Sequence, residues 1–167
     1  MKKLSGLSIG AVMSLAFAAY AETPLPQVDA ASFEQILGTD WNGSLTYLNY
    51  SAPFKDFTIP AQVEVTSAAN GVSLFFKYPD EPQQNGGQTL EISEQGRRFG
   101  GDRVTLSMTD AEGMTEIRTE GPCQDLGRAA SCEMIYRFSN VSMGVKKLVT
   151  YEGESQSFRR SEFQFSR

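Results

Sequence analysis

The residues best suited to hold a charged ligand lie in the segment Phe158–Phe165. If this segment is a strand, Phe163 and Phe165 share one face with Arg159, because side chains alternate between the two faces of a strand. An arginine inside an apolar barrel needs an anionic partner, since an unpaired buried charge is very costly. That partner could be a protein carboxylate or the acid group of a ligand. The alternative is that the arginine stacks on Trp41 through a cation–π contact.

Tyrosines are the second set of residues that could line a binding site. Five of them are spread over the segments after residue 40, and each combines an apolar ring with a polar hydroxyl. We expect Tyr47 and Tyr136 to join Arg159 or Arg160 in binding a small apolar or amphipathic molecule, one that could carry a carboxylate. The alternative is that these tyrosines fill the core or lie half-buried at strand ends.

The absence of histidine limits the chemistry that this chain can perform. It excludes Ser-His-Asp and Cys-His catalysis, zinc bound through histidine, and haem with a proximal histidine. Glycoside hydrolysis requires two carboxylates at a fixed separation, which Glu116 and Glu120 could supply. Arg118 between them favours a solvated ion-pair face instead. We therefore expect no enzyme activity, no cofactor and no bound metal.

The first 21 residues have the pattern of a secretory signal peptide. Lys2 and Lys3 form a charged start, Leu4–Phe17 is apolar, and Ala19–Ala21 matches an A-x-A cleavage site. The apolar stretch is shorter than the roughly 20 residues of a membrane-spanning helix. We expect cleavage after Ala21, no membrane span, and a periplasmic or secreted protein.

Two cysteines, Cys123 and Cys132, follow the predicted signal peptide. An even number of cysteines in an exported protein predicts a structural disulfide. The absence of C-x-x-C spacing makes a redox pair the weaker interpretation. We interpret the segment between the cysteines as a short, turn-rich loop, whose closure would contribute about 2.7 kcal/mol.

The chain carries a net charge of −5, which becomes more negative once Lys2 and Lys3 are removed with the signal peptide. This charge argues against nucleic acid and anionic membrane surfaces as partners. It favours a basic protein as a partner, although solubility alone also explains it.

The elements that position these residues are predicted to be short strands. Residues 41–167 form a single series of segments with alternating apolar and polar residues, separated by Gly, Asp, Asn and Pro. We expect an all-β fold, an antiparallel up-and-down barrel of about 8–10 strands, with a two-sheet β-sandwich as the alternative. Residues 22–40 form a lead segment and a short helix over Asp29–Leu37. The spacing of Ser32 and Gln35 is that of a capping box, and the helix is expected to cover one end of the barrel.

The beginning and the end of this series resemble those of the lipocalin/calycin barrels. The short helix is followed by Gly38–Gly43, which includes Trp41, and the last predicted strand is rich in arginine. The resemblance implies that Trp41 packs at the closed end beneath Arg159, Arg160 or Arg167. Similarity to fatty-acid-binding barrels implies an acid head group held by an arginine and a tyrosine near the end of the last strand. No catalytic residue follows from the resemblance.

Two main classes of function follow from these observations. The first is an exported barrel that binds a small apolar or amphipathic ligand. The second is an envelope interaction protein, such as an inhibitor of lysozyme or of a protease, with contacts from the loops Pro79–Gly87 and Cys123–Cys132. A structural envelope protein without a ligand is a third possibility. An interior filled with aromatic side chains favours the second class, and a void favours the first.

Overall fold

The computed structural model describes residues 24–51 and 54–167. The predicted signal peptide and its cleavage site lie outside the described residues. Within these residues the chain forms ten strands and three short 3-10 helices. In chain order they are η1 (Ala30–Ile36), β1 (Gly38–Asn49), β2 (Lys55–Ala68), β3 (Gly71–Lys77), η2 (Pro82–Gln84), β4 (Gly86–Ser93), η3 (Glu94–Gly96), β5 (Arg98–Phe99), β6 (Asp102–Thr109), β7 (Thr115–Asp125), β8 (Arg128–Phe138), β9 (Ser142–Tyr151) and β10 (Phe158–Ser166).

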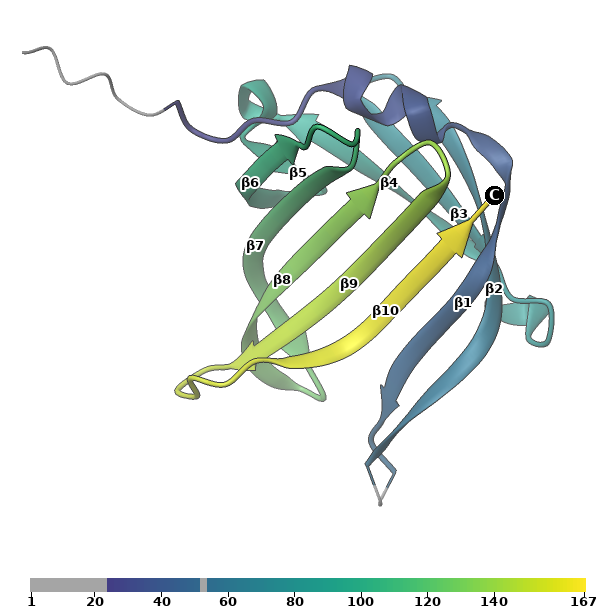
Figure 1. The fold of residues 1–167 in the computed structure, drawn as a ribbon. Coiled ribbons are helices and arrows are strands. Elements are labelled where there is room, and N and C mark those ends of the chain that lie inside the picture. The colour runs from purple at the N-terminus through teal and green to yellow at the C-terminus, as the bar shows by residue number, and fades with distance from the viewer. Residues whose placement is uncertain (1–23, 52–53) are drawn as a thin grey trace, which may run out of the picture.

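The ten strands form one closed antiparallel barrel (Figure 1). Each strand pairs with its neighbours in the sequence, and β1 pairs with β10 to close the ring. Closure satisfies the backbone groups that an open sheet would leave unpaired at its edges. The predicted all-β up-and-down barrel is confirmed, and the alternative of a two-sheet sandwich is wrong.

The segment between the two cysteines is a β-hairpin, so the interpretation as a turn-rich loop is wrong. β7 continues to Asp125 and β8 begins at Arg128, which leaves Leu126 and Gly127 as a two-residue turn. Both turn residues have positive φ angles, as a type I′ hairpin turn requires. The predicted disulfide is confirmed: Cys123 and Cys132 are bonded across β7 and β8.

The predicted N-terminal helix is present as the 3-10 helix η1. Its cap is Asp29, whose carboxylate accepts a hydrogen bond from the backbone N–H of Ala31 at 3.0 Å. The predicted cap, Ser32, lies inside the helix. A capping box at Ser32 would start the helix after this residue, whereas the helix begins at Ala30, directly after Asp29.

The helix η1 lies across one end of the barrel (Figure 1). Phe33 on this helix is buried, and its ring stacks on Phe99 and Phe138 with centroid distances of 5.1 and 5.3 Å. The space bounded by these rings and the surrounding strands is a cavity of about 10 Å³. A cavity of this size is at the lower limit for a single water molecule, so this half of the interior is filled with side chains.

Trp41 and Arg167 complete the closure at this end. Trp41 is fully buried, and its Nε1–H donates a hydrogen bond to the carbonyl of Ile36 at 2.8 Å. The Arg167 guanidinium lies 4.4 Å from the Trp41 ring centre and donates to the carbonyl of Leu37 at 3.0 Å. Of the three arginines that the resemblance offered, Arg167 is the one that stacks on the tryptophan.

Candidate functional site

The last strand contains a β-bulge at its arginines. The register between β9 and β10 shifts between Arg159 and Ser161, so that Arg160 is an extra residue without a partner in β9. A bulge reverses the faces of the residues on its two sides. After the bulge, Phe163 and Phe165 pack into the barrel, with Phe165 buried.

The bulge places Arg159 on the outer surface. Strict alternation predicts this arginine on the same face as Phe163, and that orientation is wrong because one extra residue separates them. Arg159 forms ion pairs with Asp56 on β2 and with Glu162 on its own strand. Its charge is therefore already compensated outside the barrel.

Arg160 lies at the barrel end opposite η1, which we call the open end because none of the described helices covers it (Figure 1). Its Nε–H donates to a carboxylate oxygen of Asp125 at 3.2 Å, and its Nη1–H donates to the carbonyl of Leu48 at 2.8 Å. The guanidinium also lies 4.4 Å from the ring centre of Tyr50. These contacts join β10 to β1 and β7 where β1 and β10 no longer pair.

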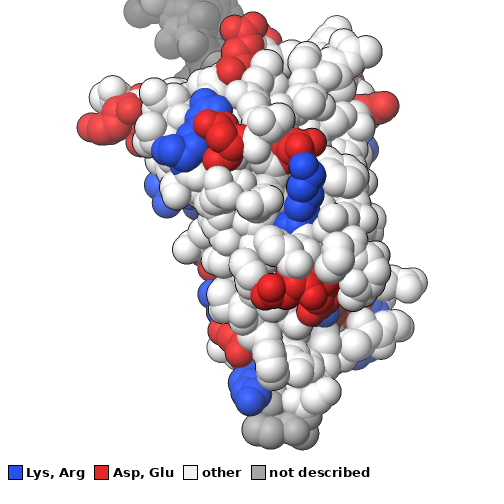
Figure 2. Space-filling view, turned by 90° about the vertical axis from the view of Figure 1, so that its right-hand side faces the viewer, with Lys and Arg blue, Asp and Glu red and all other residues white. Residues whose placement is uncertain are grey.

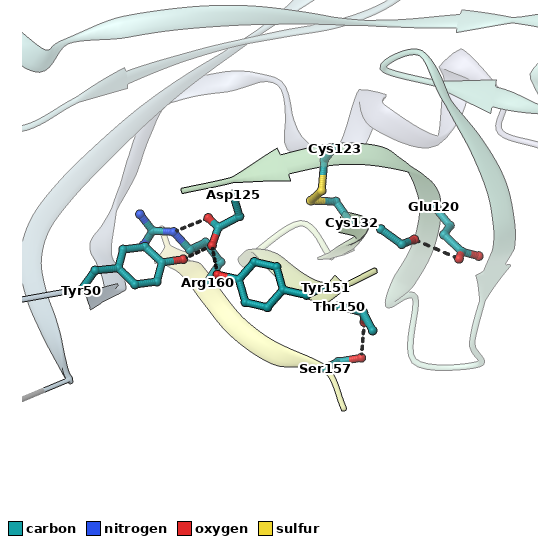
Figure 3. The surroundings of a disulfide bond; sticks show 10 residues. Tyr50, Glu120, Cys123, Asp125, Cys132, Thr150, Tyr151, Ser157 and Arg160 are labelled. Carbon is teal, nitrogen blue, oxygen red and sulfur yellow. Dashed lines mark hydrogen bonds and ion pairs between the residues drawn. A yellow bond between two sulfur atoms is a disulfide. The ribbon is translucent and has the colours of Figure 1, made fainter. Parts of the chain in front are cut away.

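Asp125 is the centre of this group of side chains (Figure 3). Its carboxylate is only 8% exposed and accepts hydrogen bonds from the hydroxyls of Tyr50 and Tyr151, as well as from Arg160. Burial raises the pKa of Asp125, but the two tyrosine hydrogen bonds and the charge of Arg160 outweigh it and lower the pKa. Burial and the bond to Asp125 both raise the pKa of Tyr50. We call Tyr50, Asp125, Tyr151 and Arg160 the rim network.

A row of side chains, four of them polar, crosses the inner face of the barrel. Adjacent strands pair Thr119 with Met134, Met134 with Lys147, Lys147 with Ser161, and Ser161 with Tyr47. Because directly paired residues in an antiparallel sheet point to the same face, these five side chains form a continuous belt. We call this row the inner belt.

The inward orientation of Lys147 follows from its neighbours on β9. Val145 and Val149, two positions away on either side, are both buried. Lys146 points to the opposite face, where it forms an ion pair with Glu162 at 3.0 Å. Lys147 is thus a half-buried amine on the inner face of the barrel.

Lys147 forms no ion pair within residues 24–51 and 54–167. Among the residues that the structure describes, none of the ion pairs includes this amine. Asp102 is a more distant acid, and its carboxylate occupies the space left by the missing side chain of Gly121. Burial raises the pKa of Asp102, and the positive charges of Arg98 and Lys147 oppose this effect only in part.

Thr119 and Tyr136 carry buried hydroxyl groups on the same inner face as Lys147. The Oγ1 atom of Thr119 is buried and has no hydrogen-bond partner in the described part of the chain. Buried hydroxyls are nearly always paired, so this hydroxyl is free to bond to a ligand at the inner belt. Tyr136 lies two residues after Met134 on β8, nearer to η1, and packs against Phe99 with ring centres 5.1 Å apart. Burial raises the pKa of Tyr136, and the charge of Asp102 raises it further.

The structure does not bring the four predicted ligand residues together. Tyr47 lies on the inner belt and Tyr136 lies deeper in the core, whereas Arg160 belongs to the rim network and Arg159 lies outside. Sequence reasoning missed Lys147, a cation on the inner face of the barrel. The sequence does contain a signal for it. Lys147 lies two positions from Val145 and from Val149, so it shares the face of these two valines in a strand.

Two further properties bear on the class of site. Among residues 24–51 and 54–167, no three metal-ligating side chains gather closely enough to hold a metal ion. In the same part of the chain, no helix has the length and apolar character needed to cross a membrane.

No protein-family model matches this chain, and no curated protein matches it.

Proposed function

We propose that this protein is an exported carrier barrel that binds a small amphipathic molecule with an acidic head group. The observation that carries the proposal is Lys147, an inward-facing amine without an ion-pair partner among the described residues. An unpaired charge in such a position costs stability unless a ligand supplies the opposite charge. In this proposal the acid group of the ligand pairs with Lys147.

The packing of the interior supports a position for the ligand in the half nearer the open end. In the next row toward η1, Ile117, Tyr136 and Val145 are buried, and the half-buried Leu45 and Phe163 pack against the core. On the inner belt Tyr47 and Lys147 are half-buried, so solvent reaches the inner face at this level. The ligand therefore does not extend toward η1, where side chains already fill the space.

The inner belt also supplies the polar groups that orient such a head group. Lysine offers three donors, and the hydroxyls of Tyr47, Ser161 and Thr119 each offer one more. A carboxylate or a phosphate has enough acceptor oxygens to use several of them at once. The predicted role of Tyr47 in ligand binding is retained in this proposal, whereas Lys147 takes the role expected of Arg159 or Arg160.

The proposal includes export to a periplasm or the cell exterior. It depends on the predicted signal peptide and agrees with the disulfide, because disulfides persist in oxidising compartments. The closed barrel with an arginine on its tryptophan is also consistent with a lipocalin-like architecture.

The alternative, an envelope interaction protein such as a lysozyme or protease inhibitor, has one observation in its favour. The half of the barrel next to η1 is filled with aromatic side chains, as expected for a barrel that does not carry a ligand. The surface offers less support for a basic partner. Figure 2 shows acidic and basic side chains interspersed on one face, without a continuous acidic area on that face.

Two variants test the carrier proposal with a matched control. Lys147→Met keeps an unbranched side chain, one atom shorter, and removes the charge inside the barrel, whereas Lys146→Met does the same outside. A hydrogen bond between charged groups contributes about 1.5–3 kcal/mol, so K147M should weaken the binding of a fluorescent fatty acid roughly 10- to 150-fold. K146M should bind as the wild type does, and a fatty alcohol should not distinguish the three proteins.

Native mass spectrometry of the protein from its own compartment, before and after organic extraction, should show an added mass that extraction removes. A chain without added mass that also fails to bind anionic amphiphiles would refute the carrier proposal. Equal affinities of wild type and K147M would refute the role of Lys147.

A further inference from the structure

The turn between β7 and β8 presents an apolar side chain in an unfavourable conformation. Leu126 is 65% exposed and has a φ angle of 50°. A positive φ is disfavoured for a bulky residue, and the first position of such a turn is usually Asn, Asp or Gly. Leu126 therefore costs stability both through its backbone and through its exposure. Strained residues of this kind cluster at ligand-binding and switch regions.

A second apolar side chain extends from the hairpin between β1 and β2. Phe54 is 69% exposed, and Phe57 on the same hairpin is also exposed. The Phe54 ring contacts the ring of Tyr50 edge-on, with centres 6.5 Å apart. Tyr50 donates its hydrogen bond to Asp125, which directly precedes Leu126. The rim network thus fixes Phe54 and Leu126 at the same end of the barrel.

We call these two side chains the apolar tips. They belong to the hairpins β1–β2 and β7–β8, which both lie at the open end of the barrel (Figure 1). The two side chains come from separate hairpins and are each about two-thirds exposed, so they can insert separately into a soft surface. Basic residues lie on the same two hairpins: Lys55 is over the ring of Phe57, and Arg128 stacks on Tyr151 and pairs with Glu154. Apolar side chains with adjacent tyrosines and long basic residues are typical of the interface of a lipid bilayer.

The net charge restricts the kind of bilayer. With a net charge of −5, the chain is repelled by an anionic lipid surface. Contact must then come from the apolar tips and suits zwitterionic lipids.

We propose that the open end docks on the surface of a zwitterionic lipid bilayer through Leu126 and Phe54, and that the amphipathic ligand enters the barrel from that bilayer. The second part of this inference rests on the proposed carrier function, and the first part does not. Docking places the inner belt next to the membrane in which an amphipathic molecule resides. The ligand then reaches Lys147 without crossing bulk water.

Flotation with phosphatidylcholine vesicles tests the docking directly. Leu126→Asn removes the apolar side chain and introduces a residue that tolerates positive φ, so the fold is retained or stabilised. Burial of two thirds of a leucine or phenylalanine side chain is worth about a tenfold change in affinity. L126N and Phe54→Ser should each weaken vesicle binding about tenfold. The control is Val141→Asn, at the end that η1 covers, where Val141 is 56% exposed; V141N should bind vesicles as the wild type does.

Transfer kinetics test the route of the ligand. The rate at which a fluorescent fatty acid moves from vesicles to the wild-type protein should rise with vesicle concentration, and for L126N this rise should be much smaller. The affinity for the same fatty acid in vesicle-free buffer should be equal in both proteins.

Wild-type vesicle binding by L126N and F54S would overturn the inference. So would binding that requires anionic phosphatidylglycerol and disappears with salt. If no fatty acid binds in vesicle-free buffer, the carrier function fails, and flotation alone still decides whether the open end docks.

Discussion

Replacement of Asp125 by asparagine should destabilise the protein more than the removal of any exposed acid. The carboxylate accepts hydrogen bonds from Tyr50, Tyr151 and Arg160 within one buried cluster. Asparagine retains one acceptor oxygen but brings an NH₂ group toward these donors. It also leaves the Arg160 guanidinium without its negative partner.

The magnitude follows from the burial of the two charges. Breaking a fully buried ion pair costs about 3–5 kcal/mol, because one charge remains without compensation. Asp125 is buried, but the Arg160 side chain is 28% exposed, so water replaces part of the lost interaction. We therefore expect Asp125→Asn to lower the free energy of unfolding by about 2–3 kcal/mol at neutral pH.

The assay is urea unfolding followed by the fluorescence of Trp41, the only tryptophan in the chain. The control is Glu120→Gln on the same strand, because Glu120 forms an exposed ion pair with Arg103. An exposed pair contributes about 0–1 kcal/mol. The slope of the unfolding free energy against urea should be the same in all three proteins.

The dependence on pH gives a second test of the same reasoning. The pKa of Asp125 is lowered in the folded protein, so its stabilisation is present above the unfolded pKa of about 3.9. The stabilisation is lost as the pH falls through the folded pKa. The difference between wild type and D125N should therefore be largest near neutral pH and should shrink below about pH 4. A cost equal to that of E120Q, or a difference that persists in strong acid, would refute the proposed electrostatic role.

Three further predictions concern single side chains. Without ligand, Lys147→Met should raise the free energy of unfolding by about 1 kcal/mol in urea titrations, because an unpaired inward charge is replaced by apolar surface; a loss of stability would contradict the unpaired state. Burial and the bond to Asp125 raise the pKa of Tyr50, so this tyrosine should still be protonated in the native protein above about pH 10. Phenolate absorbance should show one late-ionising tyrosine fewer in Tyr50→Phe, and the stabilisation from this group, complete below about pH 10, should be lost as the pH rises through the folded pKa. Arg167→Ala should cost about 2–3 kcal/mol in thermal unfolding, because the arginine stacks on Trp41 and donates to backbone carbonyls; Arg167→Lys should recover only part of this loss.

The barrel could be predicted from the sequence because its signals are local and repeated. Alternation of apolar and polar residues gives strands, and the segment around Trp41 indicates where the first strand begins. The hairpin between Cys123 and Cys132 could not be predicted, because Leu126-Gly127 lacks the Asn-Gly or Asp-Gly signal of a two-residue turn. Its conformation is imposed by the pairing and the disulfide on either side.

The candidate site could be predicted only in part. The bulge at Arg160 has no marker such as glycine or proline, and a single extra residue moves Arg159 from the inside to the outside. The inward orientation of Lys147 could be predicted from the alternation within its strand. No sequence pattern, however, places Lys147 in the same row as Tyr47 on the first strand. That neighbourhood depends on the closure of the barrel through β10.

Closure between the first and last strands also has a consequence for how the chain folds. Arg167 donates a hydrogen bond to the carbonyl of Leu37, a residue 130 positions earlier in the sequence. Contacts over such long separations form slowly, because the intervening chain must first be brought together. A growing or partly translocated chain that lacks β10 cannot form the pairing between β1 and β10, and it lacks Arg167, which covers Trp41. The barrel therefore remains incomplete until its last strand is available, which suits a protein that is predicted to cross a membrane before it folds.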